Sequence, residues 1–176
     1  MRMKYFVFFI VSVFLLIGCS LNELLESTEE TQSENTHIEV TPLNELTETQ
    51  HFKNNALKHI LEGELNYKGQ AVGFHYNQLE TKKGEIIEGT RTKPDENGVY
   101  EAKVTVSNVE KSSNNGKSTF FSDDWDTQEV VDAINEAYDN RVHINGNTFE
   151  GLTNEGIVIR MYLDNQNKII SAFPVY

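Results

Sequence analysis

Three side chains of this sequence could together move protons at a charged centre. His59 and His75 lie sixteen residues apart, and Lys117 follows them in a Gly-Lys-Ser-Thr-Phe-Phe segment. Imidazole titrates near neutral pH, so one ring can accept a proton while another donates one. An ammonium group adds positive charge beside an anion. This set matches the needs of cleaving a phosphodiester by a neighbouring hydroxyl group.

Each of these side chains also has a simpler structural interpretation. His59 could interact with the dipole at the end of a helix. His75 alternates with Phe74 and Tyr76 and could be a half-buried strand residue, while Lys117 could be a solvated turn lysine. Because a single site explains all three positions at once, we prefer the catalytic interpretation.

The elements that must position these residues are predicted from hydrophobic periodicity and turn composition. Ala102, Val104 and Val106 alternate with polar residues, which is typical of a half-buried strand. Asp126, with Glu129 three residues later, marks a helix start. The predicted elements are a helix over 46–61 that ends at Gly63, strands over 72–77, 85–90, 99–109 and 118–121, a helix from Asp126, and a hairpin of strands 157–163 and 168–175. The sequence thus predicts an α+β fold, with an N-terminal helix followed by antiparallel sheet and a second helix.

The first residues have the features of a targeting segment. Arg2 and Lys4 precede an apolar run that ends at Leu16-Ile17-Gly18-Cys19, a pattern typical of a lipoprotein signal peptide over residues 1–18. The run is too short to span a bilayer. We expect Cys19 to be acylated and to anchor the protein at the extracytoplasmic face of the cell membrane. The chain has no other cysteine, so no disulfide is expected.

Residues 19–51 carry eight Glu and no Lys or Arg, and we expect them to form a disordered acidic tether. Residues 52–176 are then one domain, in which thirteen Lys and Arg face nineteen Asp and Glu. An acidic domain is an awkward partner for nucleic acid. However, ten basic and nine acidic residues balance within 53–117, so a locally basic cleft is compatible with this composition. No His and carboxylate cluster has the spacing of metal ligands.

From His59 to Pro174 the chain resembles the bacterial EndoU nuclease domain family. The matching segments are His-Ile-Leu-x-Gly at His59, Gly-x-His at His75, Gly-Val-Tyr-Glu-Ala from Gly98, Lys-Ser-Thr-Phe-Phe at Lys117, and a hydroxyl-x-aromatic-Pro element near the C-terminus. The resemblance implies a barnase-like endoribonuclease fold and cleavage of RNA at uridines to 2',3'-cyclic phosphate ends. It also implies a reaction that requires no cofactor and that Mn²⁺ can stimulate.

The resemblance implies a role for each matching residue. His75 would be the general base on the ribose 2'-hydroxyl, His59 the general acid on the departing 5'-oxygen, and Lys117 the cation beside the phosphate. Ser171 and Phe173 would contact the substrate, with Thr119 as a further polar candidate. The partners implied are RNA and, if the protein is a toxin, a cognate immunity protein; a monomer is expected.

Alternatives remain open at this point. Phe173 stands where the family has tyrosine and lacks the hydroxyl group, so one alternative function is a catalytically degenerate RNA-binding module. Another is an envelope ligand-binding lipoprotein in which the histidines are incidental. Lys111 lies six residues before Lys117 and could take its catalytic place. Lys117 is preferred because it directly precedes the Ser-Thr-Phe-Phe segment.

Overall fold

The computed structural model describes residues 40–176 of the chain. The predicted signal peptide, the acylation site at Cys19 and the first part of the predicted tether lie outside the described residues. Within residues 40–176, no helix is both long enough and apolar enough to cross a membrane.

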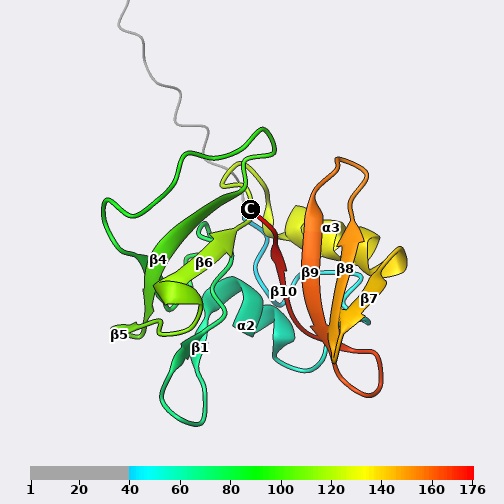
Figure 1. Ribbon diagram of the computed structural model, residues 1–176, viewed down its shortest axis with the longest axis horizontal. Helices are drawn as coiled ribbons and strands as arrows, with labels where there is room; N and C mark the ends of the chain where they lie inside the picture. The colour runs from blue at the N-terminus through cyan, green and yellow to red at the C-terminus, as the bar shows by residue number, and fades with distance from the viewer. Residues whose placement is uncertain (1–39) are drawn as a thin grey trace, which may run out of the picture. The chain divides into compact units, whose positions relative to one another are not determined.

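The described chain is an α+β domain with two α-helices, one 3-10 turn and ten strands, mostly short (Figure 1). In chain order they are α2 (Ala56–Glu62), β1 (Glu64–Leu65), β2 (Ala71–Val72), β3 (Gly84–Ile86), β4 (Tyr100–Val106), β5 (Val109–Glu110), η1 (Asn114–Gly116), β6 (Lys117–Phe120), α3 (Thr127–Asp139), β7 (Val142–Asn145), β8 (Thr148–Leu152), β9 (Val158–Leu163) and β10 (Ile169–Pro174).

One half of the domain is an antiparallel sheet in the order β10-β9-β8-β7, with α3 packed on β8 and β9 (Figure 1). The larger hydrophobic core lies here and includes Ile134, Ile159, Met161 and Ile169, all fully buried. The predicted C-terminal hairpin is confirmed as β9 and β10, which pair antiparallel. β10 also contacts α2 and β6, so it joins the two halves.

The other half is built around β4, which pairs with β3 on one side and with β5 and β6 on the other. Its alternating pattern is confirmed, because Ala102, Val104 and Val106 are buried. These residues pack with Phe74 and Phe120 in a second, smaller core. The predicted strand over 99–109 is in fact two strands, because Ser107 and Asn108 have positive φ and form a tight turn.

The predicted start of the second helix is confirmed in detail. The Asp126 side chain accepts hydrogen bonds from the first backbone N–H groups of α3, and the Glu129 side chain returns to the Asp126 N–H. This capping box satisfies donors that would otherwise be unpaired. The buried face of α3 includes Val130, Ile134 and Tyr138, as predicted.

The predicted first helix is wrong at its start. Only Ala56–Glu62 is helical, although the helix does end at Gly63 as predicted. Asn55 has a left-handed conformation with φ of 67°, and Glu48 has φ of 52°, so no regular helix runs through residues 46–55. The apolar residues before Ala56 that suggested a longer helix lie in irregular chain, and Leu46 packs from there against the larger core.

Residues 40–51 differ from the expected tether because they pack on the domain. Val40, Leu43 and Leu46 are partly buried against the larger core. Thr41 donates to Asp126 through both its backbone N–H and its hydroxyl group, each at 2.6 Å. This contact was not predicted, because the segment is acidic and has few aliphatic side chains, a composition that is typical of a disordered tether.

Two short strands also depart from prediction. The strand predicted over 72–77 covers only Ala71–Val72, so His75 lies in irregular chain after it. The strand predicted over 85–90 is Gly84–Ile86. In both regions the chain turns sharply, with Gly73, Phe74 and Gly89 at positive φ.

Candidate active site

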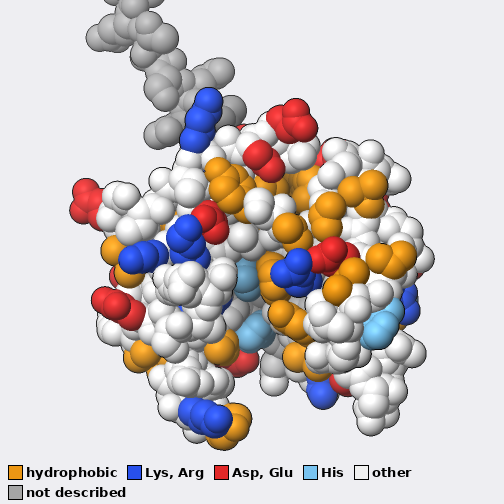
Figure 2. Space-filling model, viewed as in Figure 1, with side chains coloured by type: hydrophobic (Ala, Val, Ile, Leu, Met, Phe, Trp, Pro, Cys, Tyr) orange, Lys and Arg blue, Asp and Glu red, His pale blue; other side chains and the backbone are white. Residues whose placement is uncertain are grey.

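A cleft with a volume of about 820 Å³ lies between the two halves of the domain and is lined by α2, β6, β9 and β10. Figure 2 shows histidine side chains inside this hollow and Lys or Arg side chains on both sides of it. The lining includes every predicted catalytic and substrate-binding residue, namely His59, His75, Lys117, Thr119, Ser171 and Phe173. The fold therefore brings together side chains that are up to 114 positions apart in the sequence.

His75 is positioned by an unusual backbone segment. Phe74 has φ of 63°, a conformation that costs energy for a bulky residue. Its ring is fully buried over Gly84, where an added Cβ would lie 2.1 Å from the ring. The His75 N–H donates to the Ile60 carbonyl, and the His75 carbonyl accepts from the Phe121 N–H. The smaller core thus holds the strained segment in place, and with it the imidazole.

The His75 ring is held as a neutral base. Its Nδ1 lies 2.8 Å from the Thr119 carbonyl oxygen, which can only accept, so Nδ1 carries the proton and Nε2 is left with a lone pair. Burial lowers the pKa of His75 well below its usual value, and the charge of Lys111 lowers it further. The ring stacks on Phe173 with centroids 4.9 Å apart. These contacts fix both the tautomer and the orientation of the ring.

His59 lies on the last turn of α2, where two polar groups contact its ring. Nδ1 lies 3.1 Å from Glu64 Oε1, and Nε2 lies 3.1 Å from Ser171 Oγ. Burial lowers the pKa of His59, and Glu64 opposes this by favouring the charged ring. Gly73 packs so closely that a Cβ there would lie 1.9 Å from the His59 carbonyl oxygen. His59 is therefore the imidazole with a carboxylate partner, which suits its predicted role as the general acid.

The three expected substrate contacts have structural roles in the free protein. Ser171 is the partner of His59, and Phe173 is the stacking partner of His75. Thr119 holds His75 through its carbonyl oxygen, while its hydroxyl group is buried without a partner in the described chain. All three residues line the cleft, and their contacts to a substrate stay predictions.

Glu64 is not among the predicted site residues, and Lys111 was predicted only as a rival of Lys117. The signal for Glu64 was its place directly after the helix-ending Gly63, where the chain reverses and brings a carboxylate back to the last helical turn. Lys111 Nζ donates to Ser118 Oγ at 2.7 Å and to the Gly73 carbonyl at 3.3 Å. Lys117 forms an ion pair with Glu101 instead.

The resemblance implies that Mn²⁺ can stimulate the reaction, so the side chains of the described residues bear on whether the chain itself could hold this ion. Among residues 40–176, no group of three or more His, Cys, Asp or Glu side chains is arranged to hold a metal ion. The cleft residues do not fit a resident metal, and Glu64 is already paired with His59.

An α+β domain with two imidazoles and two ammonium groups in one cleft has the architecture and chemistry of a nuclease. The chain belongs to the bacterial EndoU nuclease family, which matches residues 53–176. A protein of Bacillus cereus named Toxin is 50% identical to it over 132 residues. The match covers 75% of this chain and 24% of that relative, so the chain spans about a quarter of the length of the relative. No solved structure matched the chain.

Proposed function

We propose that the protein is an endoribonuclease that cleaves RNA by attack of a ribose 2'-hydroxyl on the adjacent phosphate. The observation that carries this proposal is the asymmetry of the two imidazoles. His75 has its proton on Nδ1 and a free lone pair on Nε2, whereas His59 has a carboxylate on Nδ1 that favours its charged form. One ring is prepared to accept a proton and the other to donate one.

The reaction begins with transfer of the 2'-hydroxyl proton to His75 Nε2. The 2'-oxygen forms a bond to phosphorus, and the bond from phosphorus to the 5'-oxygen breaks. His59 Nε2 gives its proton to the departing 5'-oxygen. The products are a 2',3'-cyclic phosphate and a 5'-hydroxyl end, and the two histidines have exchanged their protonation states. Each proton transfer contributes roughly 10²- to 10⁴-fold to the rate.

In the free protein Ser171 Oγ occupies the hydrogen-bonding position at His59 Nε2. Donation to the 5'-oxygen requires that Nε2 exchange Ser171 for the substrate. Ser171 is then free to contact the nucleotide, as expected from the family element in which it lies. The aromatic rings of Phe173 and Tyr162, which line the same cleft, supply apolar surface for a base. We propose uridine as the preferred base on the family resemblance.

We further propose that the enzyme acts outside the cytoplasmic membrane, held by a lipid on Cys19. The support for this placement is the signal-like segment of the sequence. A toxin acting on other cells is the biological role that fits best, because the Bacillus cereus relative is named Toxin. Such a nuclease calls for a cognate immunity protein that blocks the cleft.

The test is incubation of the protein with RNA in EDTA and, separately, with Mn²⁺. We expect cleavage under both conditions, because the proposed steps use only side chains of the chain. His59→Ala and His75→Ala should each lower the rate. A folded protein that binds RNA but does not cut it would favour the degenerate binding module, and cutting that requires Mn²⁺ would contradict the metal-independent mechanism.

A further inference from the structure

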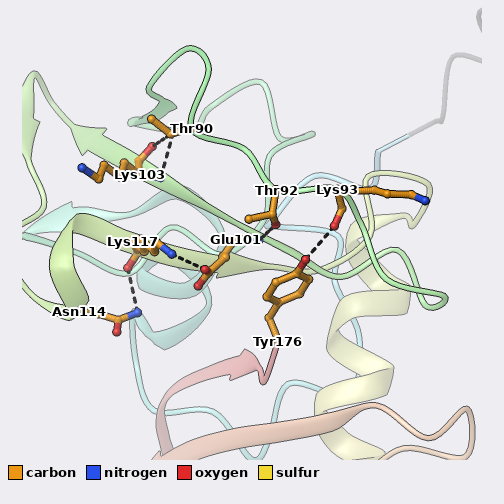
Figure 3. A network of polar contacts seen from close by, with 8 residues as sticks. All are labelled: Thr90, Thr92, Lys93, Glu101, Lys103, Asn114, Lys117 and Tyr176. Carbon is orange, nitrogen blue, oxygen red and sulfur yellow. Dashed lines mark hydrogen bonds and ion pairs between the residues drawn. The ribbon is translucent and has the colours of Figure 1, made fainter.

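The two lysines of the cleft are in different electrostatic states. Lys117 is paired with the Glu101 carboxylate, and Figure 3 shows its ammonium group directed at that carboxylate. Lys111 has two neutral partners, the Ser118 hydroxyl and the Gly73 carbonyl. A cation paired with a carboxylate has little net field at a neighbouring anion, whereas a cation held by dipoles keeps its charge. Lys111 is therefore the stronger source of positive potential.

Lys111 also lines the same cleft as His59 and His75. Its carbonyl partner belongs to Gly73, where an added Cβ would be 3.3 Å from His59 Cδ2. Gly73 is two residues before His75 in the chain. Consistent with this position, the charge of Lys111 contributes to lowering the pKa of both His59 and His75. Lys111 thus lines the same cleft as both rings, and its ammonium is anchored to the chain segment that leads into His75.

The ammonium group of Lys111 has a donor to spare. An ammonium carries three N–H donors, and two are used by Ser118 and Gly73. Ser118 is itself 1% exposed and donates to the same Gly73 carbonyl at 3.1 Å, so the two partners of Lys111 are held in place. Because Lys111 lines the cleft, the third donor can be offered to a substrate oxygen.

We propose that Lys111, and not Lys117, is the catalytic cation that donates a hydrogen bond to a non-bridging phosphoryl oxygen during RNA cleavage. This inference rests on the proposed endoribonuclease function. Lys111 keeps its protons throughout, since the 2'-hydroxyl proton goes to His75 and the 5'-oxygen receives its proton from His59. Its contribution is to stabilise the negative charge that develops on the phosphoryl oxygens.

The topology explains why the sequence pattern favoured the other lysine. β5 and β6 pair with the same edge of β4, and residues 111–116 form the loop that connects them. The Lys111 N–H bonds to the Val104 carbonyl, while Lys117 is registered opposite Lys103. The two lysines are six positions apart in sequence but almost adjacent along β4. Sequence order alone cannot tell which of them faces the imidazoles.

The test compares Lys111→Met with Lys117→Met in the full chain, using a uridine-containing dinucleotide with a single phosphodiester. This substrate has no flanking phosphates, so contacts outside the reacting centre do not contribute. We expect Lys111→Met to lower kcat by about 10²- to 10³-fold, as for loss of a transition-state donor. Lys117→Met should stay within about fivefold of wild type, because the Glu101 carboxylate already offsets the Lys117 charge and a partly exposed ion pair is worth little.

Binding of a transition-state mimic gives a readout that a structural defect would not reproduce. Uridine vanadate imitates the five-coordinate phosphorus, and uridine 3'-phosphate imitates the product ground state. We expect Lys111→Met to weaken vanadate binding much more than phosphate binding, with no such difference for Lys117→Met. Loss of both activity and vanadate binding in Lys117→Met, with Lys111→Met unaffected, would overturn the assignment.

Should Lys111→Met fail to fold, Lys111→Arg decides the question. Burial lowers the pKa of Lys111 to about 8, so the fall of kcat with rising pH should steepen above about pH 8 in the wild type. Arginine stays charged at these pH values, so the steepening should vanish in Lys111→Arg. Steepening that persists would overturn the proposal. A wild-type protein that cuts no RNA would instead refute the proposed function itself.

Discussion

In the proposed mechanism, Glu64 is the residue that separates the tasks of the two imidazoles. Both rings are buried and both have lowered pKa values, but only His59 has a carboxylate that opposes the shift. With His75 as a neutral base and His59 as an acid whose pKa is lowered by burial, the wild-type kcat should be highest on the acidic side of neutrality. The activity then falls as rising pH removes the proton from His59.

Glu64→Gln should move this alkaline fall to lower pH. The amide keeps a hydrogen-bond acceptor at Nδ1 but removes the charge that raises the pKa of His59. Proton NMR titration of the His59 ring in both proteins measures the effect directly, and Asp164→Asn, at the ion pair with Lys53, is a control that changes the net charge by the same amount. An unchanged His59 titration would show that Glu64 has no electrostatic role.

Phe173 has a testable role as support for the general base. Its ring stacks on His75 and contacts Tyr162, so Phe173→Ala should free the imidazole to rotate. Stacked rings contribute roughly 0.5–1.5 kcal/mol, which predicts a fall in kcat of about 2- to 10-fold. Phe173→Tyr keeps the ring and should retain wild-type kcat on a dinucleotide. A larger loss in Phe173→Tyr than in Phe173→Ala would contradict this role.

The second helix depends on one carboxylate for two attachments. Asp126 caps α3 and also accepts two hydrogen bonds from Thr41. Asp126→Ala should lower the free energy of unfolding by about 2 kcal/mol, since a lost cap alone costs about 1 kcal/mol. Urea unfolding measures this, and Thr41→Val, which keeps the backbone donor, should cost less. Equal losses in the two variants would mean that the cap contributes nothing.

Elements were predictable where local chemistry alone decides them. The capping box, the alternation of β4 and the C-terminal hairpin each follow from patterns within a few residues. The segment before α2 and the chain around His75 were not predictable, because their conformation is set by distant partners such as Asp126, Ile60 and Gly84. Tertiary contacts there outweigh the propensities on which pattern reasoning rests.

The candidate site was predictable as a set of residues but not as an arrangement. The family segments supplied His59, His75 and Ser171, and the structure places them in one cleft. The choice between Lys111 and Lys117 depends on which lysine is neutralised by Glu101, and no sequence pattern records that pairing. The pairing of Phe173 with His75 was likewise hidden, because it joins residues nearly one hundred positions apart.

The domain as a whole should need residues 40–51 for full stability. This segment contributes partly buried Val40, Leu43 and Leu46, and hydrogen bonds through Thr41 and Thr47. A protein beginning at residue 52 should lose on the order of 3 kcal/mol of unfolding free energy relative to one beginning at residue 40. Equal urea midpoints for the two proteins would show that the segment does not stabilise the fold.

Stability should also fall as the medium becomes acidic. His75 has a pKa well below the value of about 6.5 expected in the unfolded chain, so unfolding takes up protons below that pH. The penalty is absent above about pH 6.5 and grows as the pH falls toward the folded-state pKa. His75→Gln, which can still donate to Thr119, should show a flatter dependence of urea midpoint on pH between 6.5 and 5. Identical slopes would contradict a buried neutral His75.

The most direct test of the account is the chemistry of the cut ends. The full chain is incubated with an RNA of mixed sequence and with DNA of the same sequence, beside His75→Ala. We predict RNA fragments with 2',3'-cyclic phosphate and 5'-hydroxyl ends, no cleavage of the DNA, and a rate at least about 10²-fold lower in His75→Ala. Cleavage of the DNA, or 5'-phosphate ends on the RNA, would contradict attack by the 2'-hydroxyl and the role of His75 as its base.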